Sequence, residues 1–394
     1  MIGQSRKNIC FISSNHAPLD DRIYWKMALS LKKNEYHVTH LCVSDRNKEY
    51  TTEEGIKIIE IKRPRLVSND YLDIILKILL FKNVYKTLLK KAIEQRSDFY
   101  HFHDVQINRI AMKLKALPWK PKILYDSREP YPLTYQLYFQ GNIFKKILGH
   151  FYSKYIEKVE KSHSPFYDMT ITNADGVTEY FKEVTSKVIT IYNYSNFLVP
   201  ESEENFEKKF DLIYCGGISK YRGAMIMLEV VKLSVENKNP LKLLLLGSVK
   251  EKGLKEKMEK YISDNKLQNW ISMPGHVKHN DVPNYYKESK IGLILFAKQP
   301  VYKVILPIKL FEYMNFGLPI VGSNFGPVCE YIIRDKTGLP SDPENPLNIY
   351  NTIIYLLKNT KLYTDIQNNS KDIVRKKYNW KIMEDELLRI FNNL

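Results

Sequence analysis

The sequence lacks any uncharged apolar run of about 18 residues, the length that a membrane-spanning helix needs. Its first apolar segment, residues 8–13, comes too early and is too short to be the hydrophobic region of a signal peptide. We therefore expect a cytoplasmic protein. A position at the inner face of the cytoplasmic membrane is also compatible with these features.

Cysteine is scarce, with four residues spread widely along the chain. Cys10, Cys42 and Cys215 lie in apolar, strand-like runs, which favours buried free thiols over disulfides. Neither these three residues nor Cys329 have the close spacing of a metal cluster. We therefore expect no structural metal.

Acidic residues are outnumbered by basic ones, 44 against 60. Residues 1–196 contain 31 basic and 21 acidic residues, so the excess is larger in the first half. Nucleic acid, an anionic membrane or a phosphorylated substrate would each be attracted by such a charge. A lysine-rich surface that is merely solvated explains the same numbers.

The chain of 394 residues, 44% of them hydrophobic, is long enough for two domains with separate cores. Short β-rich runs alternate with helical segments, which predicts an α/β fold with doubly wound parallel sheets. In the first half we expect strands at residues 8–13, 37–43, 99–102, 122–125, 169–172 and 188–192, and helices at residues 22–33, 71–94, 107–117 and 143–162.

A polar, acidic stretch at residues 196–209 predicts a linker between an N-terminal domain, residues 1–195, and a C-terminal domain, residues 210–379. A last helix, residues 380–394, follows and is expected to cross back to the first domain. In the second half we expect strands at residues 210–215, 241–246, 270–273, 291–295 and 319–322, and helices at residues 223–237, 254–265, 282–288 and 308–316.

A glycine turn joins the strand at residues 210–215 to the next helix. It contains Gly216 and Gly217, followed by Lys220 and Arg222. Glycines let backbone amides approach a ligand, and the two cations add charge, as a pyrophosphate site requires. The turn has neither the P-loop pattern nor the dinucleotide pattern, so ATPase and dehydrogenase functions lose their main support. A glycine pair between strand and helix is also ordinary turn chemistry.

The segment of residues 306–321 forms a second cluster, in which Lys309 and Glu312 lie one helical turn apart. An exposed pair of this kind would contribute only ~0.2–0.5 kcal/mol to helix stability. A carboxylate held there could instead accept hydrogen bonds from ribose hydroxyls, as acidic residues do in other nucleotide sites.

Two histidines, His101 and His103, follow each other on one face of a predicted strand. A neutral imidazole there could orient a transferred group, or it could simply be packed in the core. The helix at residues 71–91 combines apolar and lysine faces, which suits either an anionic membrane surface or an ordinary solvated helix.

The glycine turn, residues 216–223, resembles the phosphate-binding turn of family 4 glycosyltransferases, and residues 306–321 resemble their donor-binding helix. Three more segments agree with the family, in the same order: Asp21-Arg22-Ile23, His101-Phe102-His103-Asp104 and Tyr125-Asp126-Ser127-Arg128-Glu129-Pro130-Tyr131-Pro132. The last two are similar to motifs of one branch of it.

The resemblance implies a GT-B fold, with two Rossmann-like doubly wound parallel-sheet domains facing across a cleft. It implies a UDP- or GDP-sugar donor in the C-terminal domain, and a glycan or lipid-linked acceptor hydroxyl in the N-terminal domain. Transfer would occur with retention of configuration, without a metal or other cofactor, and we expect a role in cell-surface polysaccharide assembly.

Matched residue by residue, Arg222 takes the place of the family's phosphate-binding lysine, and Glu312 that of the second glutamate of its Glu-x7-Glu motif. Val304 stands at the first glutamate, which leaves the donor sugar open. Lys220 could replace an arginine that many relatives carry at Gly217. The resulting candidates are His103, Arg222 and Lys220 as catalytic residues, and Gly216, Gly217, Gly247, His276, Val277, Lys309 and Glu312 as donor-binding residues.

The acceptor candidates come from the N-terminal half. Arg128 replaces a histidine of the family motif, which would favour an anionic acceptor. The full acceptor set is Asp21, Arg22, Asp104, Arg128 and Glu129.

Three other functions stay open. A non-hydrolysing nucleotide-sugar epimerase would share the two-domain form but would need no acceptor. A basic nucleic-acid-binding protein is less well supported, because the sequence has no recognised reader motif. An inactive relative that binds partners is also compatible with Val304 and Arg128.

Overall fold

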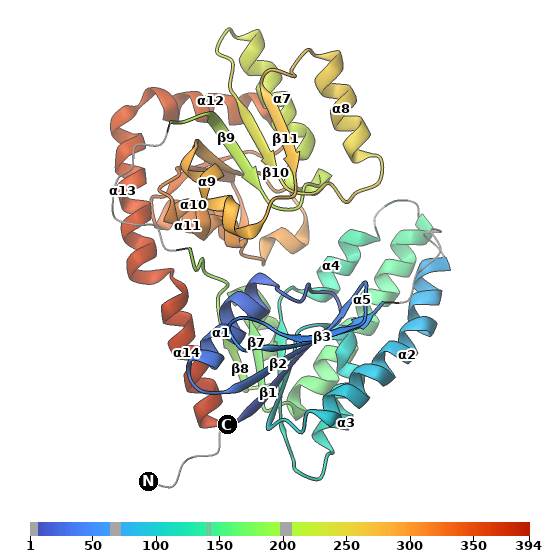
Figure 1. Ribbon diagram of the computed structural model, residues 1–394. Coiled ribbons are helices and arrows are strands. Elements are labelled where there is room, and N and C mark those ends of the chain that lie inside the picture. The colour runs from blue at the N-terminus through green and yellow to red at the C-terminus, as the bar shows by residue number, and fades with distance from the viewer. Residues whose placement is uncertain (1–6, 64–71, 140, 142, 198–206) are drawn as a thin grey trace. The chain divides into compact units, whose positions relative to one another are not determined.

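Strand β1 (Asn8–Ser13) lies in the middle of an eight-stranded sheet, and a separate six-stranded sheet is built from the second half of the chain (Figure 1). The computed structural model describes residues 7–63, 72–139, 141, 143–197 and 207–394. Within these ranges, residues 72–81 are described by their backbone alone. The chain forms an N-terminal unit, residues 1–192 and 383–394, and a C-terminal unit, residues 193–382.

The N-terminal sheet has the order β3-β4-β2-β1-β5-β6-β7-β8. Its central strands are buried on both faces, which explains their nearly continuous apolar sequence. All neighbours pair in parallel except β3 and β4, which form an antiparallel hairpin at the edge. The strands after β1 are β2 (His37–Ser44), β3 (Lys48–Thr51), β4 (Lys57–Lys62), β5 (Phe99–Phe102), β6 (Lys122–Ser127), β7 (Met169–Thr172) and β8 (Val188–Thr190).

The predicted helix at residues 22–33 is a π-helical segment, η1 (Asp21–Ala28), that continues into α1 (Leu29–Lys33). The Asp20 carboxylate caps it by accepting hydrogen bonds from the amides of Arg22 and Ile23. The remaining helical segments of this unit are α2 (Leu72–Glu94), η2 (Val105–Ile107), α3 (Asn108–Lys115), α4 (Tyr131–Tyr138), α5 (Ile143–His163), η3 (Ser164–Phe166) and α6 (Asp175–Lys182).

The C-terminal sheet is entirely parallel, in the order β11-β10-β9-β12-β13-β14. Its strands are β9 (Phe210–Cys215), β10 (Leu243–Leu246), β11 (Ile271–Gly275), β12 (Ser289–Ile294), β13 (Ile320–Ser323) and β14 (Gly338–Ser341). Its helical segments are η4 (Lys220–Arg222), α7 (Ala224–Glu236), α8 (Leu254–Asp264), η5 (His279–Asp281), α9 (Val282–Lys287), η6 (Pro300–Lys303), α10 (Ile308–Asn315), α11 (Gly326–Arg334), α12 (Pro346–Lys358) and α13 (Thr360–Lys377).

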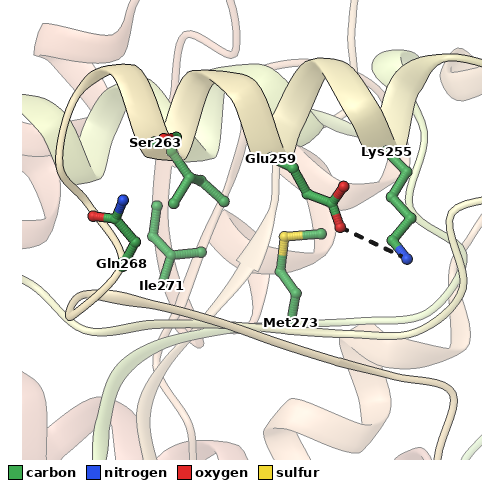
Figure 2. Close-up of a pocket in the computed structure, with 7 residues that line it drawn as sticks. Lys255, Glu259, Ser263, Gln268, Ile271 and Met273 are labelled. Carbon is green, nitrogen blue, oxygen red and sulfur yellow. Dashed lines mark ion pairs between the residues drawn. The ribbon is translucent and has the colours of Figure 1, made fainter.

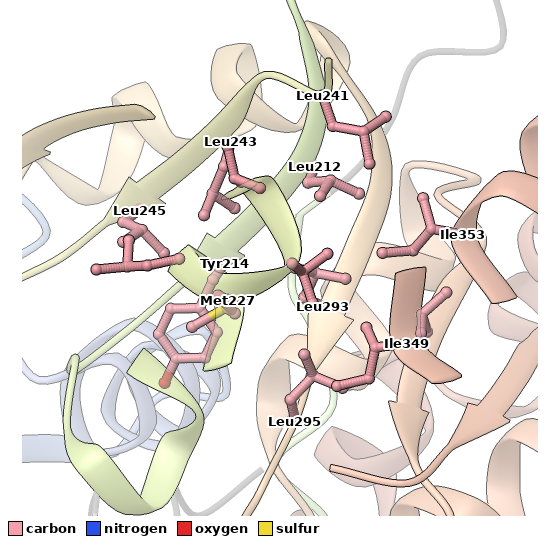
Figure 3. Packing of buried hydrophobic residues seen from close by; sticks show 14 of the residues in the cluster. Leu212, Tyr214, Met227, Leu241, Leu243, Leu245, Leu293, Leu295, Ile349 and Ile353 are labelled. Atoms are coloured by element: carbon pink, nitrogen blue, oxygen red, sulfur yellow. The ribbon is translucent and has the colours of Figure 1, made fainter. Parts of the chain in front are cut away.

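One face of the C-terminal sheet packs on α7 and α12 (Figure 3). Leu212 of β9 and Leu293 of β12 lie beside Ile349 and Ile353 of α12, and all four side chains are fully buried. Burying a side chain of this size stabilises the fold by ~1.5–3 kcal/mol. This core therefore holds the carboxyl ends of β9 and β12 firmly in place.

The last helix, α14 (Trp380–Asn393), ends among the strands of the N-terminal unit. The ring of Phe391 packs edge-on against Phe99 at 5.1 Å and lies 6.1 Å from Tyr36. The hydroxyl of Tyr36 also donates to Asn392. These contacts make the C-terminal residues 383–394 part of the first unit.

Several elements were not predicted. The edge strand β3 is exposed or half-exposed along its length, and charged residues interrupt the apolar pattern of its buried partner β4. The short helices α4 and α6, and β14 with α11, α12 and α13, were missed as well. The first sheet is therefore mixed, where a purely parallel sheet was expected.

Candidate functional site

Two glycines bring the ends of β9 and β10 into backbone contact. Gly216 and Gly247 have φ angles of 128° and 145°, which disfavour other residues. The Gly216 amide donates to the Leu246 carbonyl at 2.8 Å. A Cβ atom on Gly247 would lie 2.0 Å from the Gly216 carbonyl oxygen, so no side chain fits there. The turn therefore presents bare backbone at the carboxyl edge of the sheet.

Lys309 of α10 points its ammonium group toward this turn. Its Nζ would lie 3.0 Å from a Cβ atom on Gly216, and it lies 4.0 Å from the centre of the Tyr214 ring. The Phe296 ring is 5.9 Å away, so the cation is held by aromatic faces. Lys309 forms no ion pair with an acidic residue of the described chain, and it is only 6% exposed. The arrangement places one buried positive charge beside the glycine turn.

Glu312 lies on the same helix, 8% exposed, and its carboxylate accepts a 2.6 Å hydrogen bond from Tyr286. Burial and then the Glu312 charge raise the pKa of Cys215 to about 12, which shows how near the carboxylate is to the end of β9. The hydroxyl of Tyr313 accepts a hydrogen bond from the Cys215 amide. Lys309 and Glu312 are therefore not an exposed helix pair, because both are buried, Lys309 beside the glycine turn and Glu312 beside Tyr286.

Arg222 and Lys220 follow the turn in η4. Arg222 donates to the Gly217 carbonyl at 3.4 Å, so its guanidinium lies over the glycine pair. Lys220 is half-exposed, and its Nζ lies 3.9 Å from the carboxylate of Glu251, which also accepts from the Lys220 amide. Glu251 was not predicted, because a glutamate in a lysine-rich loop carries no local signal. Glu251 partly neutralises Lys220, whereas the guanidinium of Arg222 is placed by its hydrogen bond to the Gly217 carbonyl.

The other donor candidates lie on loops at the same edge. Gly275 accepts a hydrogen bond from the Gly247 amide, so the loop after β11 adjoins the glycine turn. His276 is exposed and Val277 is half-buried on that loop. Val304 follows η6 and is half-buried, with no polar group to offer. All seven predicted donor residues thus belong to neighbouring loops or to α10.

In the N-terminal unit, Arg22 and Asp126 form a fully buried ion pair. The guanidinium donates to the two carboxylate oxygens at 2.9 and 3.3 Å and to the Ile191 carbonyl at 2.7 Å. Both side chains have no exposed surface. The prediction that Arg22 contacts an acceptor is therefore corrected. Asp126 neutralises the Arg22 guanidinium inside the N-terminal unit, and the ion pair links η1 to β6.

His101 and His103 stack on each other with ring centres 4.5 Å apart, and both are fully buried. His103 Nδ1 lies 3.3 Å from the Asp126 carboxylate. Burial lowers the pKa of His103, and the charge of Asp126 opposes this effect. Its packing against Phe11 matches the alternative of a core histidine, and a catalytic contact would require it to become accessible.

These histidines and Asp126 offer three potential metal-ligand atoms within 4.8 Å of one another. However, the guanidinium of Arg22 already occupies both oxygens of that carboxylate. A second positive charge beside it would be repelled in such a dry site. The residues therefore fit a metal ion poorly.

Asp104 has a structural role as well. Its carboxylate accepts from the Ser14 amide at 2.5 Å and the Asn15 amide at 3.1 Å, which fixes the loop after β1. Burial alone would raise its pKa, but His16 and these amides hold the pKa well below its usual range. The residue is 1% exposed, so direct acceptor contact is excluded in this conformation.

Three acceptor candidates keep accessible surface. Arg128 pairs with Asp20 at 2.9 Å and is 15% exposed. Asp21 pairs with Lys26 at 2.7 Å and is 26% exposed. Glu129 is half-buried on the loop after β6. Acceptor contacts by these three residues remain predictions.

A shallow groove of about 340 Å³ lies along α8, beside the edge strand β11 (Figure 2). It contains an ion pair between Lys255 and Glu259, and none of the candidate residues. Its lining includes Ile262, Ser263, Gln268, Ile271 and Met273.

In the part of the chain that the structure describes, no helix combines the length and the apolar character needed to cross a membrane. Helix α2 covers the predicted segment of residues 72–91. Tyr71 lies outside the described residues, as do the side chains of residues 72–81, so the predicted membrane contact of this helix stays a prediction.

The sequence model of the family described as glycosyl transferases group 1 matches residues 198–373. An uncharacterized glycosyltransferase from Haemophilus influenzae is 23% identical over 353 residues, which cover 89% of this chain and 90% of that protein. A Methanocaldococcus jannaschii glycosyltransferase, also uncharacterized, is 26% identical over 263 residues, 64% of each chain.

Two solved structures show the same fold. Sucrose-phosphate synthase from Thermosynechococcus elongatus superposes with a TM-score of 0.77 at 14% identity, covering 98% of this chain and 99% of that chain. Anabaena HepE, solved with UDP and glucose, gives a TM-score of 0.73 at 13% identity, covering 99% and 100%. Residues 198–373 therefore match glycosyl transferases group 1, and the two Rossmann-like α/β units of the chain have the fold of GT-B glycosyltransferases.

Proposed function

We propose that the protein transfers a sugar from a nucleoside-diphosphate donor, a UDP- or GDP-sugar, to a hydroxyl of a glycan or lipid-linked acceptor, with retention of configuration. One observation supports the proposed location of the donor site. The buried ammonium of Lys309 and the guanidinium of Arg222 flank a turn whose glycines expose bare backbone. This is the chemistry that a diphosphate requires.

The reaction explains why the charges are needed. Breaking the bond between the anomeric carbon and the diphosphate places negative charge on the leaving phosphate and positive charge on the sugar. A preorganised donor aimed at developing charge contributes ~2.7–4 kcal/mol to transition-state stabilisation in comparable sites. Lys309 is held by Tyr214 and Phe296 before any ligand arrives, so little reorganisation is needed.

Glu312 is proposed to accept hydrogen bonds from the donor ribose. Tyr286 donates to one carboxylate oxygen and thereby orients the group. A carboxylate fixed in this way, next to the glycine turn, recognises vicinal hydroxyls. The solved complex of Anabaena HepE with UDP and glucose, a structure of the same fold, supports a nucleotide donor here.

The acceptor is assigned to the N-terminal unit, through Asp21, Arg128 and Glu129. Arg128 is partly exposed beside its partner Asp20, and its replacement of the family's histidine favours an acceptor with an anionic group. An anionic, membrane-linked glycan would fit a role in cell-surface polysaccharide assembly at the inner face of the membrane. No metal or other cofactor is assigned to the reaction.

Donor binding can be tested by thermal unfolding with UDP-, GDP-, ADP- and CMP-sugars. A ligand at ~100-fold excess over its dissociation constant stabilises the native state by about 2.7 kcal/mol. We expect a UDP- or GDP-sugar to raise the midpoint of the wild type, and less so that of Lys309→Met. Equal midpoints with every nucleotide sugar would contradict the proposal.

The same donor, incubated without acceptor, separates the alternatives. An epimerase would convert the sugar of the donor, whereas a transferase leaves it unchanged until an acceptor hydroxyl is supplied. Salt-sensitive retention on DNA or RNA without any nucleotide-sugar effect would indicate a nucleic-acid-binding protein.

A further inference from the structure

Helix α5 carries a row of exposed apolar side chains. Six large residues on this helix are between 45% and 76% exposed. They fall on one side at helical spacing, and an apolar face of this kind marks an interaction surface. The residues, which we call the α5 apolar face, are Ile143, Phe144, Ile147, Leu148, Phe151 and Tyr155.

The outward direction of this face is set by packing on the opposite side. Gly149 meets α4 so closely that a Cβ atom would lie 2.3 Å from the Phe139 Cβ. Ser153 is buried and donates to the Pro132 carbonyl at 2.8 Å, and Ile156 is buried one turn later. The helix pair of α4 and α5 (Figure 1) therefore cannot turn the apolar face inward without breaking these contacts.

The charges of α5 indicate what covers the face. The helix contains five lysines and two glutamates. Glu160 is buried, so Glu157 is the one accessible acid on the helix, and it pairs with Lys154 and Lys161. Lys146 and Lys158 are exposed beside the apolar residues. Apolar side chains mixed with lysines and few acids match a surface of negative charge with an apolar interior.

A packed aromatic row leads from this face to the predicted acceptor side. Tyr131 donates to the His103 carbonyl at 3.1 Å and stacks 6.4 Å from Tyr135. Tyr135 lies edge-on to Tyr152 at 4.8 Å, and Tyr152 is 6.2 Å from Tyr155. The α5 apolar face is thus joined by packed aromatic rings to the loops after β5 and β6.

We infer that the α5 apolar face docks on an anionic lipid bilayer, with Phe144 and Phe151 inserted among the acyl chains and the lysines at the headgroups. One helix face of this size gives reversible attachment that depends on anionic lipid. The surface lies in the N-terminal unit, so docking would hold the acceptor loops near lipid-linked substrates.

Co-sedimentation with phosphatidylcholine vesicles, with and without phosphatidylglycerol, tests the inference. The full chain should bind the anionic vesicles and bind more weakly in high salt, because salt screens the lysines. The double substitution Phe144→Ser and Phe151→Ser should weaken binding by about tenfold or more. Lys146→Gln and Lys158→Gln should each weaken it by ~fivefold on anionic vesicles and leave neutral vesicles unaffected.

A matched control comes from α12 of the other unit. Leu347 and Tyr355 are 52% and 56% exposed on a single helix. Changing both to serine should leave vesicle binding unchanged. Thermal midpoints of all variants should stay near that of the wild type, because the replaced side chains lie in water.

Three results would overturn the inference. The first is a wild-type chain that binds no anionic vesicle, and the second is full binding by the phenylalanine double variant. The third is a wild-type dimer in light scattering that the same variant converts to monomer, since a second copy would then cover the face. None of these readouts depends on sugar transfer.

Discussion

The ammonium group of Lys309 lies 4.0 Å from the centre of the Tyr214 ring. Tyr214 lies near the end of β9, just before the glycine pair. The two residues come from α10 and β9 and are 95 positions apart in sequence, counted from their numbers. The contact holds a positive charge at the carboxyl edge of the sheet without an acidic partner in the described chain. This is the edge at which the donor diphosphate is proposed to bind.

Replacing Lys309 by methionine should therefore harm donor use more than folding. Methionine keeps the apolar stem against Tyr214 and removes the charge. We expect kcat/KM for the nucleotide sugar to fall by at least about tenfold, equivalent to ~1.4 kcal/mol. Steady-state kinetics beside thermal unfolding would check this, and an unchanged kcat/KM in a folded variant would contradict the role of Lys309.

Arg222→Ala is expected to lower turnover by at least about tenfold while the protein stays folded, because the guanidinium lies over the Gly217 carbonyl. Lys220→Ala is the comparison, since it removes a cation from the same turn. Its effect should be smaller, because Glu251 already offsets part of that charge. Equal losses in the two variants would mean that Arg222 has no special position.

Gly247→Ala should destabilise the C-terminal unit and weaken donor binding. Its new Cβ would meet the Gly216 carbonyl at 2.0 Å, so one of the two turns must move. Gly253→Ala is matched for a positive φ angle, 75°, but its Cβ would meet nothing within 4 Å. Urea unfolding and donor titration should separate the two variants, and similar losses would show that backbone strain alone is responsible.

Glu160 should make the N-terminal unit less stable as the pH rises. Burial raises the pKa of this carboxyl to about 8, and its partners are the hydroxyls of Tyr125, Ser127 and Tyr180. The folded state thus keeps a proton that the unfolded chain releases near the ordinary glutamate pKa of 4.5. The stabilisation is complete below that pH and is lost by about pH 8, at up to about 1.4 kcal/mol per pH unit.

Unfolding in urea at about pH 5, 6.5 and 8, which lie between the two pKa values of Glu160, would measure this loss. Glu160→Gln cannot ionise, so its stability should gain on the wild type as the pH rises. Glu157→Gln is the control, because lysines hold the pKa of Glu157 below its usual value and it stays ionised throughout. Parallel profiles for wild type and Glu160→Gln would show that Glu160 carries no such proton.

Arg22→Met should lower the stability of the N-terminal unit by ~3–5 kcal/mol, because it leaves the buried carboxylate of Asp126 without its partner. The double change Arg22→Met and Asp126→Leu should recover much of that loss. Denaturant unfolding would measure both. If Arg22→Met instead unfolds at the wild-type midpoint and has a raised KM for the acceptor, the original prediction that Arg22 contacts the acceptor would be supported.

Local patterns in the sequence were enough to locate most strands and the helices next to the candidate site. The strand at residues 210–215, the glycine turn and the helix beginning at Ile308 were predicted within a residue or two, because β-rich runs and helix-end residues are local signals. The edge hairpin of β3 and β4 was missed, because its pairing is decided by neighbouring backbone, and because β3 is largely exposed while charged residues interrupt the apolar pattern of β4.

The roles of the charged residues were decided by the tertiary structure. Arg22 and Asp126 are 104 positions apart, and only the sheet order brings them together. Sequence alone could not show that one cation, Lys309, faces the glycine turn while another, Arg22, is neutralised inside the core. Side-chain type sets which charges the chain carries, but burial and the distance to a partner decide which of them can meet a ligand, and both depend on contacts between distant segments.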